Sequence, residues 1–237
     1  MSSMQAVLDQ VEAQTQRFRA HPLFGFLHET RTEPERGLVL APALAHFVMT
    51  FADVYRFVLR SEPAGDEYQK LVNAHTYEDG GHWKWFLADL KKLGHDPRIH
   101  FSDALRFLWG EDTVQLRLLS YNICRLGIGA SSIHKLVLVQ CIEATGSVML
   151  GSVAPLGQAL RERTGQALTY FGPHHFETES DHTLEQEQVH SFVAGVELPQ
   201  ALCAELLGLV DATFALFSAV ADEMTTFARR GRGIPYA

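Results

Sequence analysis

The sequence predicts an all-α protein in which residues 1–237 form a single domain. Apolar residues recur three or four positions apart along nearly the whole chain, which is the spacing of amphipathic helices. No alternation of apolar and polar residues bounded by turn residues indicates a strand, and no repeat or long linker marks a second domain. With 46% hydrophobic content in 237 residues, the chain is long enough to bury a substantial core.

Three helices are expected in the N-terminal half, over residues 4–20, 38–61 and 66–93. Each is followed closely by proline or glycine, which end helices because proline lacks a backbone donor and glycine adopts the left-handed cap conformation. The second helix is apolar enough to suggest a membrane span. Asp53 and Arg56 interrupt it, however, and ionisable groups are costly in the middle of a bilayer. We therefore expect a core helix and no association with a membrane.

Further helices in the C-terminal half bring the expected total to seven or eight. Ser102 is expected to cap the first of them, and Pro155 is expected to kink the longest. The expected ranges are 102–109, 112–126, 131–163, 174–193 and 200–229, followed by a loose tail over 230–237.

Charge and cysteine usage exclude several classes of protein. The formal net charge is −8, so no basic surplus exists to neutralise phosphates, and nucleic acid is not expected as a partner. The three cysteines are widely spaced and form no CxxC motif, so we expect no disulfide framework. The N-terminus shows no basic segment followed by an apolar run, so we expect no signal peptide and a cytoplasmic location.

The helix expected over residues 66–93 carries polar groups where a buried face would carry leucine. His75, Glu78 and His82 stand at positions i, i+3 and i+7 and share one face. Burying such groups without partners would cost several kcal/mol each, so they require partners or a ligand. The alternative is a surface helix whose polar face happens to carry these residues. Asp79, next to Glu78, is a further candidate ligand.

A second polar segment lies in the helix expected over residues 174–193. His175, Glu179 and His182 share one of its faces, with spacing that allows two imidazoles and a carboxylate to meet one ion. A competing face, or a solvated acidic helix, is the alternative. The competing face carries His174, Glu177 and Asp181.

Glu143 stands in an almost wholly apolar helix, where a lone buried charge is unfavourable. A metal ion or a paired arginine would compensate this charge, and a raised pKa would leave the carboxyl group neutral. Three helices that each offer inward carboxylates or imidazoles form the pattern of iron sites in bundle cores. Because the donors are oxygen and nitrogen without thiolate, we expect iron, with manganese as the alternative, over a structural zinc site.

These motifs make the chain similar to the heme-oxygenase-like di-iron oxidases, which belong to the superfamily of heme oxygenase and the TenA-type thiaminases. The resemblance implies a heme-oxygenase/TenA-like bundle and an O2-dependent non-heme di-iron oxidoreductase acting on a small organic substrate. The ligands that it implies are Glu78 and His82, with His75 as a further candidate, then Glu143, and last His175, Glu179 and His182. The sequence departs from the family pattern at Glu179, where an aspartate is usual, and in its crowded first motif.

Two other functions remain open. The first is a TenA-like hydrolase of a thiamin-type pyrimidine, with Cys141 as nucleophile and with Trp85 and Glu223 also at the substrate pocket. Against it, Cys141 has no histidine beside it in sequence to activate the thiol. The second is a catalytically silent helical binding protein. Heme is not expected, and apolar helix faces also permit a homodimer.

Overall fold

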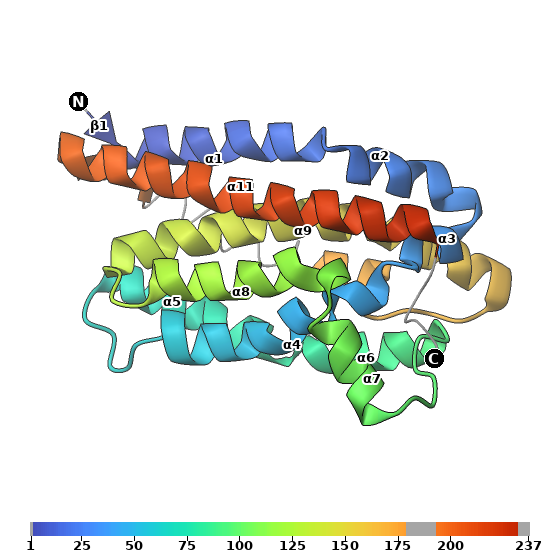
Figure 1. Cartoon of the computed structure of the whole chain (residues 1–237). Helices are drawn as coiled ribbons and strands as arrows, with labels where there is room; N and C mark the ends of the chain where they lie inside the picture. Colours follow the sequence, from blue (N-terminus) through green and yellow to red (C-terminus); the bar gives the residue numbers. More distant parts are fainter. Residues whose placement is uncertain (1, 179–192, 232–237) are drawn as a thin grey trace.

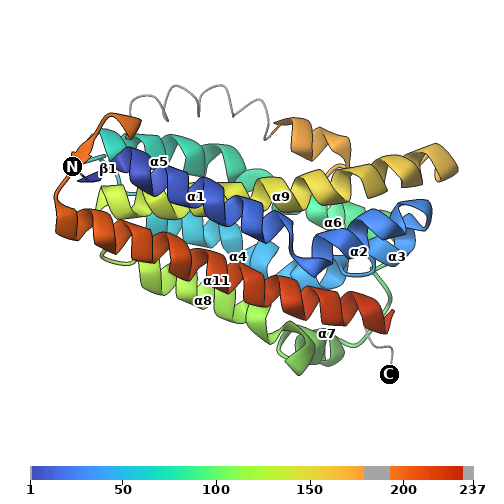
Figure 2. The ribbon, with the colours of Figure 1, turned by 90° about the horizontal axis from the view of Figure 1, so that it is seen from above.

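The computed structural model describes residues 2–178 and 193–231, and the fold is all-α, as predicted. The long helix α9 occupies the middle of the bundle, where it contacts α1, α5, α8 and α11 (Figures 1 and 2). One cluster of buried apolar residues draws side chains from all of these helices. The elements, in chain order, are β1 (Ser2–Ser3), α1 (Met4–Arg19), α2 (Pro22–Glu29), η1 (Thr30–Thr32), α3 (Pro34–Leu38), η2 (Ala41–Leu44), α4 (Ala45–Val54), η3 (Tyr55–Leu59), α5 (Glu67–Glu78), η4 (Asp79–Gly81), α6 (Trp83–Lys92), α7 (Phe101–Leu108), η5 (Glu111–Thr113), α8 (Val114–Gly127), α9 (Ser132–Thr164), β2 (Glu197–Leu198) and α11 (Gln200–Arg230).

The N-terminal helix α1 ends one residue before the predicted boundary. Its buried residues, among them Val7, Val11 and Phe18, face α9 and α11, which lie beside it in both views (Figures 1 and 2). The two-residue strands β1 and β2 form an antiparallel pair, and they precede α1 and α11 in the sequence. The sequence did not predict this pairing, because a strand of two residues is too short to show alternation.

The helix predicted over residues 38–61 begins earlier and is divided into several pieces. Short turns around Pro42 separate α3 from α4, and the last part, η3, is a π-helix. The backbone N–H of Arg60 donates to the carbonyl of Tyr55 across this wider turn, at 2.9 Å. Single π turns inside helices often occur at functional sites. Here the π turn begins at Tyr55, whose hydroxyl reaches the Glu143 carboxylate.

The helix predicted over residues 66–93 is also divided. Asp66 caps α5 by accepting a hydrogen bond from the backbone N–H of Gln69, at 2.8 Å. The 3-10 turn η4 then separates α5 from α6 at the Asp79-Gly-Gly sequence, where two glycines lower helix propensity. The tighter turn changes which side chains of this segment face the interior.

The start of the next two helices differs from the prediction in how each is capped. The N-cap position of α7 is His100 and not Ser102, so the predicted cap is wrong. The start of α8 is capped from a distant helix, because the Glu223 carboxylate of α11 accepts hydrogen bonds from two of its first backbone N–H groups. Sequence reasoning looks for caps in adjacent residues and therefore could not find this one.

The remaining helices follow the predicted ranges closely. α9 stays helical through Pro155 and ends at Gly165, which has the positive φ of a helix C-cap. Residues 173–178 begin the helix predicted over 174–193, residue 193 is again helical, and residues 179–192 lie outside the described residues. The predicted tail is described only as far as residue 231.

By length and apolar composition alone, three stretches could cross a membrane: Pro34–Leu59, Ser132–Thr164 and Gln200–Arg230. Of these, the sequence pattern drew attention only to the first. The most apolar part of each stretch is partly buried inside the fold, over 56%, 50% and 39% of its residues. These helices therefore serve as core elements of the bundle in this structure.

Candidate metal centre

Three ionisable side chains from different elements meet inside the bundle. His75 comes from the last turn of α5, Asp79 from η4 and Glu143 from the middle of α9. The Nε2 atom of His75 lies 2.9 Å from Oε1 of Glu143 and 3.2 Å from Oδ2 of Asp79. One potential ligand atom from each residue lies within 4.8 Å of the others, so these three side chains could hold a metal ion.

The charges of this cluster are strongly coupled. Burial alone would lower the pKa of His75, but the neighbouring carboxylates of Glu143 and Asp79 raise it to about 11. Burial would raise the pKa of Asp79, yet its contacts with His75 and His82 lower it below the ordinary value. Without a metal, an imidazolium therefore holds the two carboxylates together, at the position that a metal cation would take.

Asp79 retains one unused ligand atom. Its Oδ1 atom is buried and accepts no hydrogen bond from any residue that the structure describes, and Asp79 is only 7% exposed. This oxygen lies 4.0 Å from Nδ1 of His82, whereas Oδ2 faces His75. Since buried carboxylate oxygens are nearly always bonded, this one indicates a site that gains a partner when a cation binds. Asp79 thus lies between His75 and His82, each of which offers an imidazole nitrogen.

The second group of donors is the pair formed by His82 and His175. The Nδ1 atom of His82 lies 3.2 Å from Nε2 of His175. The other nitrogen of His175 lies 3.0 Å from the carbonyl oxygen of Tyr170, and because a carbonyl can only accept, Nδ1 of His175 carries the proton. The lone pair on Nε2 of His175 therefore faces His82. A backbone carbonyl that fixes the tautomer in this way is typical of metal-binding histidines.

The turn that presents His175 is held by a fully buried carboxylate. Asp89 of α6 accepts hydrogen bonds from the three consecutive backbone N–H groups of residues 169–171, at 2.7 to 3.1 Å. This turn packs so closely against α9 that a Cβ atom at Gly157 would lie 2.3 Å from the carbonyl oxygen of Phe171. Glycine at this position is thus required to bring the turn, and His175 after it, to the centre.

Tyr55 is a member of the site that sequence reasoning missed. Its hydroxyl lies 3.1 Å from Nε2 of His75 and donates to Oε1 of Glu143 at 3.3 Å, and its side chain is fully buried. A tyrosine in an apolar helix normally indicates only core packing. The π turn that aims its hydroxyl at the cluster has no signal in the sequence.

The structure separates the predicted ligands into three groups. His75, His82, Glu143 and His175 are brought together, with Asp79 between them. Glu78 is exposed, whereas Asp79, four residues after His75, faces inward in its place. Glu179 and His182 lie outside the described residues.

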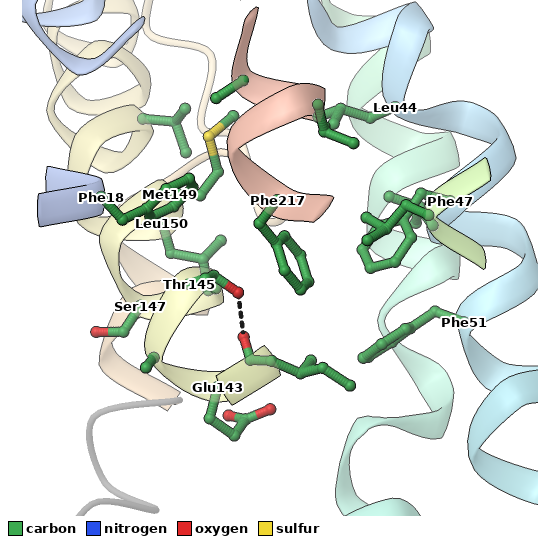
Figure 3. A pocket seen from close by; sticks show the side chains of 18 of the residues that line it. Phe18, Leu44, Phe47, Phe51, Glu143, Thr145, Ser147, Met149, Leu150 and Phe217 are labelled. Atoms are coloured by element: carbon green, nitrogen blue, oxygen red, sulfur yellow. Dashed lines mark hydrogen bonds between the residues drawn. The ribbon is translucent and has the colours of Figure 1, made fainter. Parts of the chain in front are cut away.

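A large cavity opens beside this cluster. It has a volume of about 440 Å³ and is lined mainly by apolar side chains of α1, α4, α9 and α11. Asp79, His82, Glu143 and His175 line its polar end. Figure 3 shows Glu143 at one end of the cavity, with Phe47, Phe51 and Phe217 above it.

None of the three residues predicted at a substrate pocket lines this cavity. Cys141 is completely buried on another face of α9, and burial raises the pKa of its thiol. Glu223 caps the start of α8 instead. Trp85 has a different role near the centre: its ring stacks on the imidazole of His82, with the centroids 4.5 Å apart.

No protein-family model and no curated protein matches this sequence, so the function of the chain has to be inferred from its residues and their geometry.

Proposed function

We propose that this chain is an O2-dependent non-heme iron oxidoreductase that acts on an organic molecule held in the adjoining cavity. The observation that carries the proposal is Asp79, whose Oδ2 atom faces His75 and whose buried Oδ1 atom, which has no hydrogen bond among the described residues, lies 4.0 Å from Nδ1 of His82. The all-α bundle with donors from three helical segments is also what a heme-oxygenase/TenA-like fold would provide.

The donors present fit iron. Imidazole nitrogens and carboxylate oxygens without thiolate suit iron or manganese. His75, Asp79 and Glu143 would hold one ion, and Asp79, His82 and His175 would surround a second, with Asp79 shared between them. Carboxylates and imidazoles that project inward from several helices are the groups that hold the metal ions in di-iron bundle proteins.

The surrounding residues orient the side chains that would bind the metal and keep water away from a bound substrate. Tyr55 donates to Glu143, and Tyr170 accepts from His175, so a carboxylate and an imidazole are each aimed by a hydrogen bond. The apolar walls of the cavity exclude water from a bound substrate. When bound, ferrous iron supplies the reaction with O2 that side chains alone do not provide.

The hydrolase alternative receives no support from the geometry. A nucleophilic cysteine must reach the substrate and form a thiolate readily, whereas Cys141 is buried outside the cavity lining and its pKa is raised. A metal-free binding protein would use the same cavity, and its failure to take up iron would separate it from the oxidoreductase.

The test is iron content and O2 consumption after anaerobic addition of Fe(II) to the purified chain. We expect about two irons per chain, as in other di-iron bundles, and O2 uptake by the loaded protein. Glu143→Gln removes a charged ligand and should lose both. Glu162→Gln, which changes an exposed carboxylate near the end of the same helix, should lose neither. If the wild-type chain takes up no iron, the proposal fails and a metal-free binding protein replaces it.

A further inference from the structure

The walls of the cavity are unusually rich in aromatic rings. Phe18, Phe24, Phe47, Phe51 and Phe217 all contribute to its lining. The charged lining groups of the described residues stand elsewhere, either in the cluster around Glu143 or at Glu12 and Arg19, which are exposed. Between these two regions the cavity offers apolar surface, so the body of its ligand is expected to be uncharged.

Several of these rings form a continuous row that leads to the cluster. Phe217 and Phe47 meet edge to face with centroids 6.1 Å apart, and Phe47 and Phe51 are 5.1 Å apart. The Phe51 ring is in turn 4.2 Å from that of Tyr55, which hydrogen-bonds to Glu143. Phe47, Phe51 and Tyr55 are spaced by four residues, so α4 and the π turn present them along one face.

The opposite wall combines sulfur and aliphatic groups with the ring of Phe18 (Figure 3). Met149 and Leu150 of α9 lie across the cavity from Phe47 and Phe51, and Glu143 closes one end between the two walls (Figure 3). Thioether sulfur makes favourable contacts with aromatic rings. Aromatic rings on both sides of the cavity, with a thioether beside Phe18, therefore favour a flat π-system over a saturated body of the same size.

We infer that the cavity selects an aromatic substrate of one or two rings, whose ring lies between the Phe47–Phe51 row and Met149 and whose substituent points to Glu143. The volume of about 440 Å³ falls within the range of small-molecule sites, roughly 300 to 1,000 Å³. Oxidation of this substrate rests on the proposed function, but its binding does not, because the aromatic walls stand without a metal.

The experiment compares two neutral alcohols with the same carbon skeleton in calorimetric titrations of the metal-free chain. One is 2-naphthylmethanol, and the other is its saturated counterpart, decahydro-2-naphthylmethanol. Burial of apolar area alone would favour the saturated compound, which exposes more aliphatic surface to water. Contacts with the aromatic walls should reverse this order, so we expect the naphthyl compound to bind about fivefold to tenfold more tightly.

Matched variants locate the effect. Phe217→Leu and Phe51→Leu should each abolish most of the preference for the naphthyl compound while the cavity stays apolar. Phe101→Leu, which changes a ring that is exposed on α7, should leave the preference unchanged. Thermal unfolding of each variant checks that the bundle still forms, and having two lining variants keeps the test valid if one of them does not fold.

The outcomes separate this inference from the proposed function. Equal or tighter binding of the saturated compound, a preference that survives in both lining variants, or no binding of either compound would overturn the inference. Naphthyl selectivity in a chain that takes up no iron would retain the aromatic site and refute the oxidoreductase. Iron uptake without naphthyl selectivity would support the metal centre of the proposed function and refute the aromatic site.

Discussion

The Oδ2 atom of Asp79 lies 3.2 Å from Nε2 of His75, while its other carboxylate oxygen is buried and has no hydrogen-bond partner in the described part of the chain. This arrangement is unfavourable in an empty protein and favourable in one that binds a cation, because the unbonded oxygen then gains a ligand bond. It makes Asp79 the residue on which metal binding should depend most.

Asp79→Asn should therefore weaken Fe(II) binding at least about 100-fold, because an amide brings no charge to the cation and even outer-shell changes cost 10-fold to 100-fold. Equilibrium titration with Fe(II) under anaerobic conditions measures this. Glu78→Gln is the matched control, since Glu78 is the exposed neighbour of Asp79, and it should bind iron as the wild type does. A larger loss in Glu78→Gln than in Asp79→Asn would restore the ligand set expected from the sequence.

Tyr55→Phe removes one hydroxyl and keeps the ring that packs on Phe51. This hydroxyl donates a hydrogen bond to Glu143 and thereby fixes the orientation of the carboxylate. Its loss should therefore weaken Fe(II) affinity about 10-fold. The absorption spectrum of the Co(II)-loaded chain should also change, which a purely structural role would not cause. Tyr77→Phe on α5, whose hydroxyl bonds to the exposed Glu62, should show neither effect. Identical affinities and spectra in the two variants would remove Tyr55 from the site.

Asp89→Asn tests how the turn before His175 is held. The buried carboxylate accepts from three backbone N–H groups and pairs with Lys92, so its neutralisation should lower the free energy of unfolding by about 3 kcal/mol. Asp103→Asn, which breaks a pair with the exposed Arg106, should cost less than about 1 kcal/mol. Urea unfolding measures both values. Similar costs for the two variants would mean that Asp89 does not organise the turn.

His46 gives the fold a pH dependence that is separate from the metal centre. Burial, and then the charge of Arg117, lower the pKa of His46 below 6.5. Its Nδ1 atom has no hydrogen-bond partner among the residues that the structure describes. The unfolded chain therefore binds a proton at His46 more readily than the folded chain does. Stability from this group is complete above pH 6.5 and is lost as the pH falls toward the folded pKa.

His46→Phe should remove this loss, because phenylalanine fits between the rings of Trp109 and Tyr121 and does not titrate. Urea unfolding at pH about 7.5 and about 5.5 should show a smaller decrease in stability for the variant than for the wild type. His134→Phe, a partly exposed histidine paired with Glu205, serves as the control. An equal decrease in wild type and His46→Phe would show that His46 is protonated without cost.

Most of the helices could be predicted because each buries one face, and burial on one face imposes a regular apolar spacing on the sequence. The differences arise where a single turn changes pitch. At η3 the π turn aims Tyr55 at Glu143, and at η4 a 3-10 turn divides the segment that carries Glu78, Asp79 and His82. Periodicity is averaged over many residues and cannot register a change of one residue in the rotation of a helix.

Contacts between distant segments were the other part that the sequence did not reveal. Glu223 lies on the last helix, from which it could face a pocket, yet it caps α8 from more than a hundred residues away. Asp89 shows no motif, because its three partners are backbone N–H groups of a turn that any residues could form. The histidines and Glu143 could be predicted as site residues from the sequence. A buried imidazole or carboxylate on an apolar helix face is unfavourable unless it binds a partner or a ligand.

The most direct test of the metal centre is anomalous diffraction at the iron edge from crystals of the chain loaded anaerobically with Fe(II). We expect a peak bounded by His75 Nε2, Asp79 and Glu143, with the contact between His75 and Glu143 opened to admit the ion. A structure in which His75 still bonds directly to Glu143, with no iron between them in protein loaded under these conditions, would contradict it.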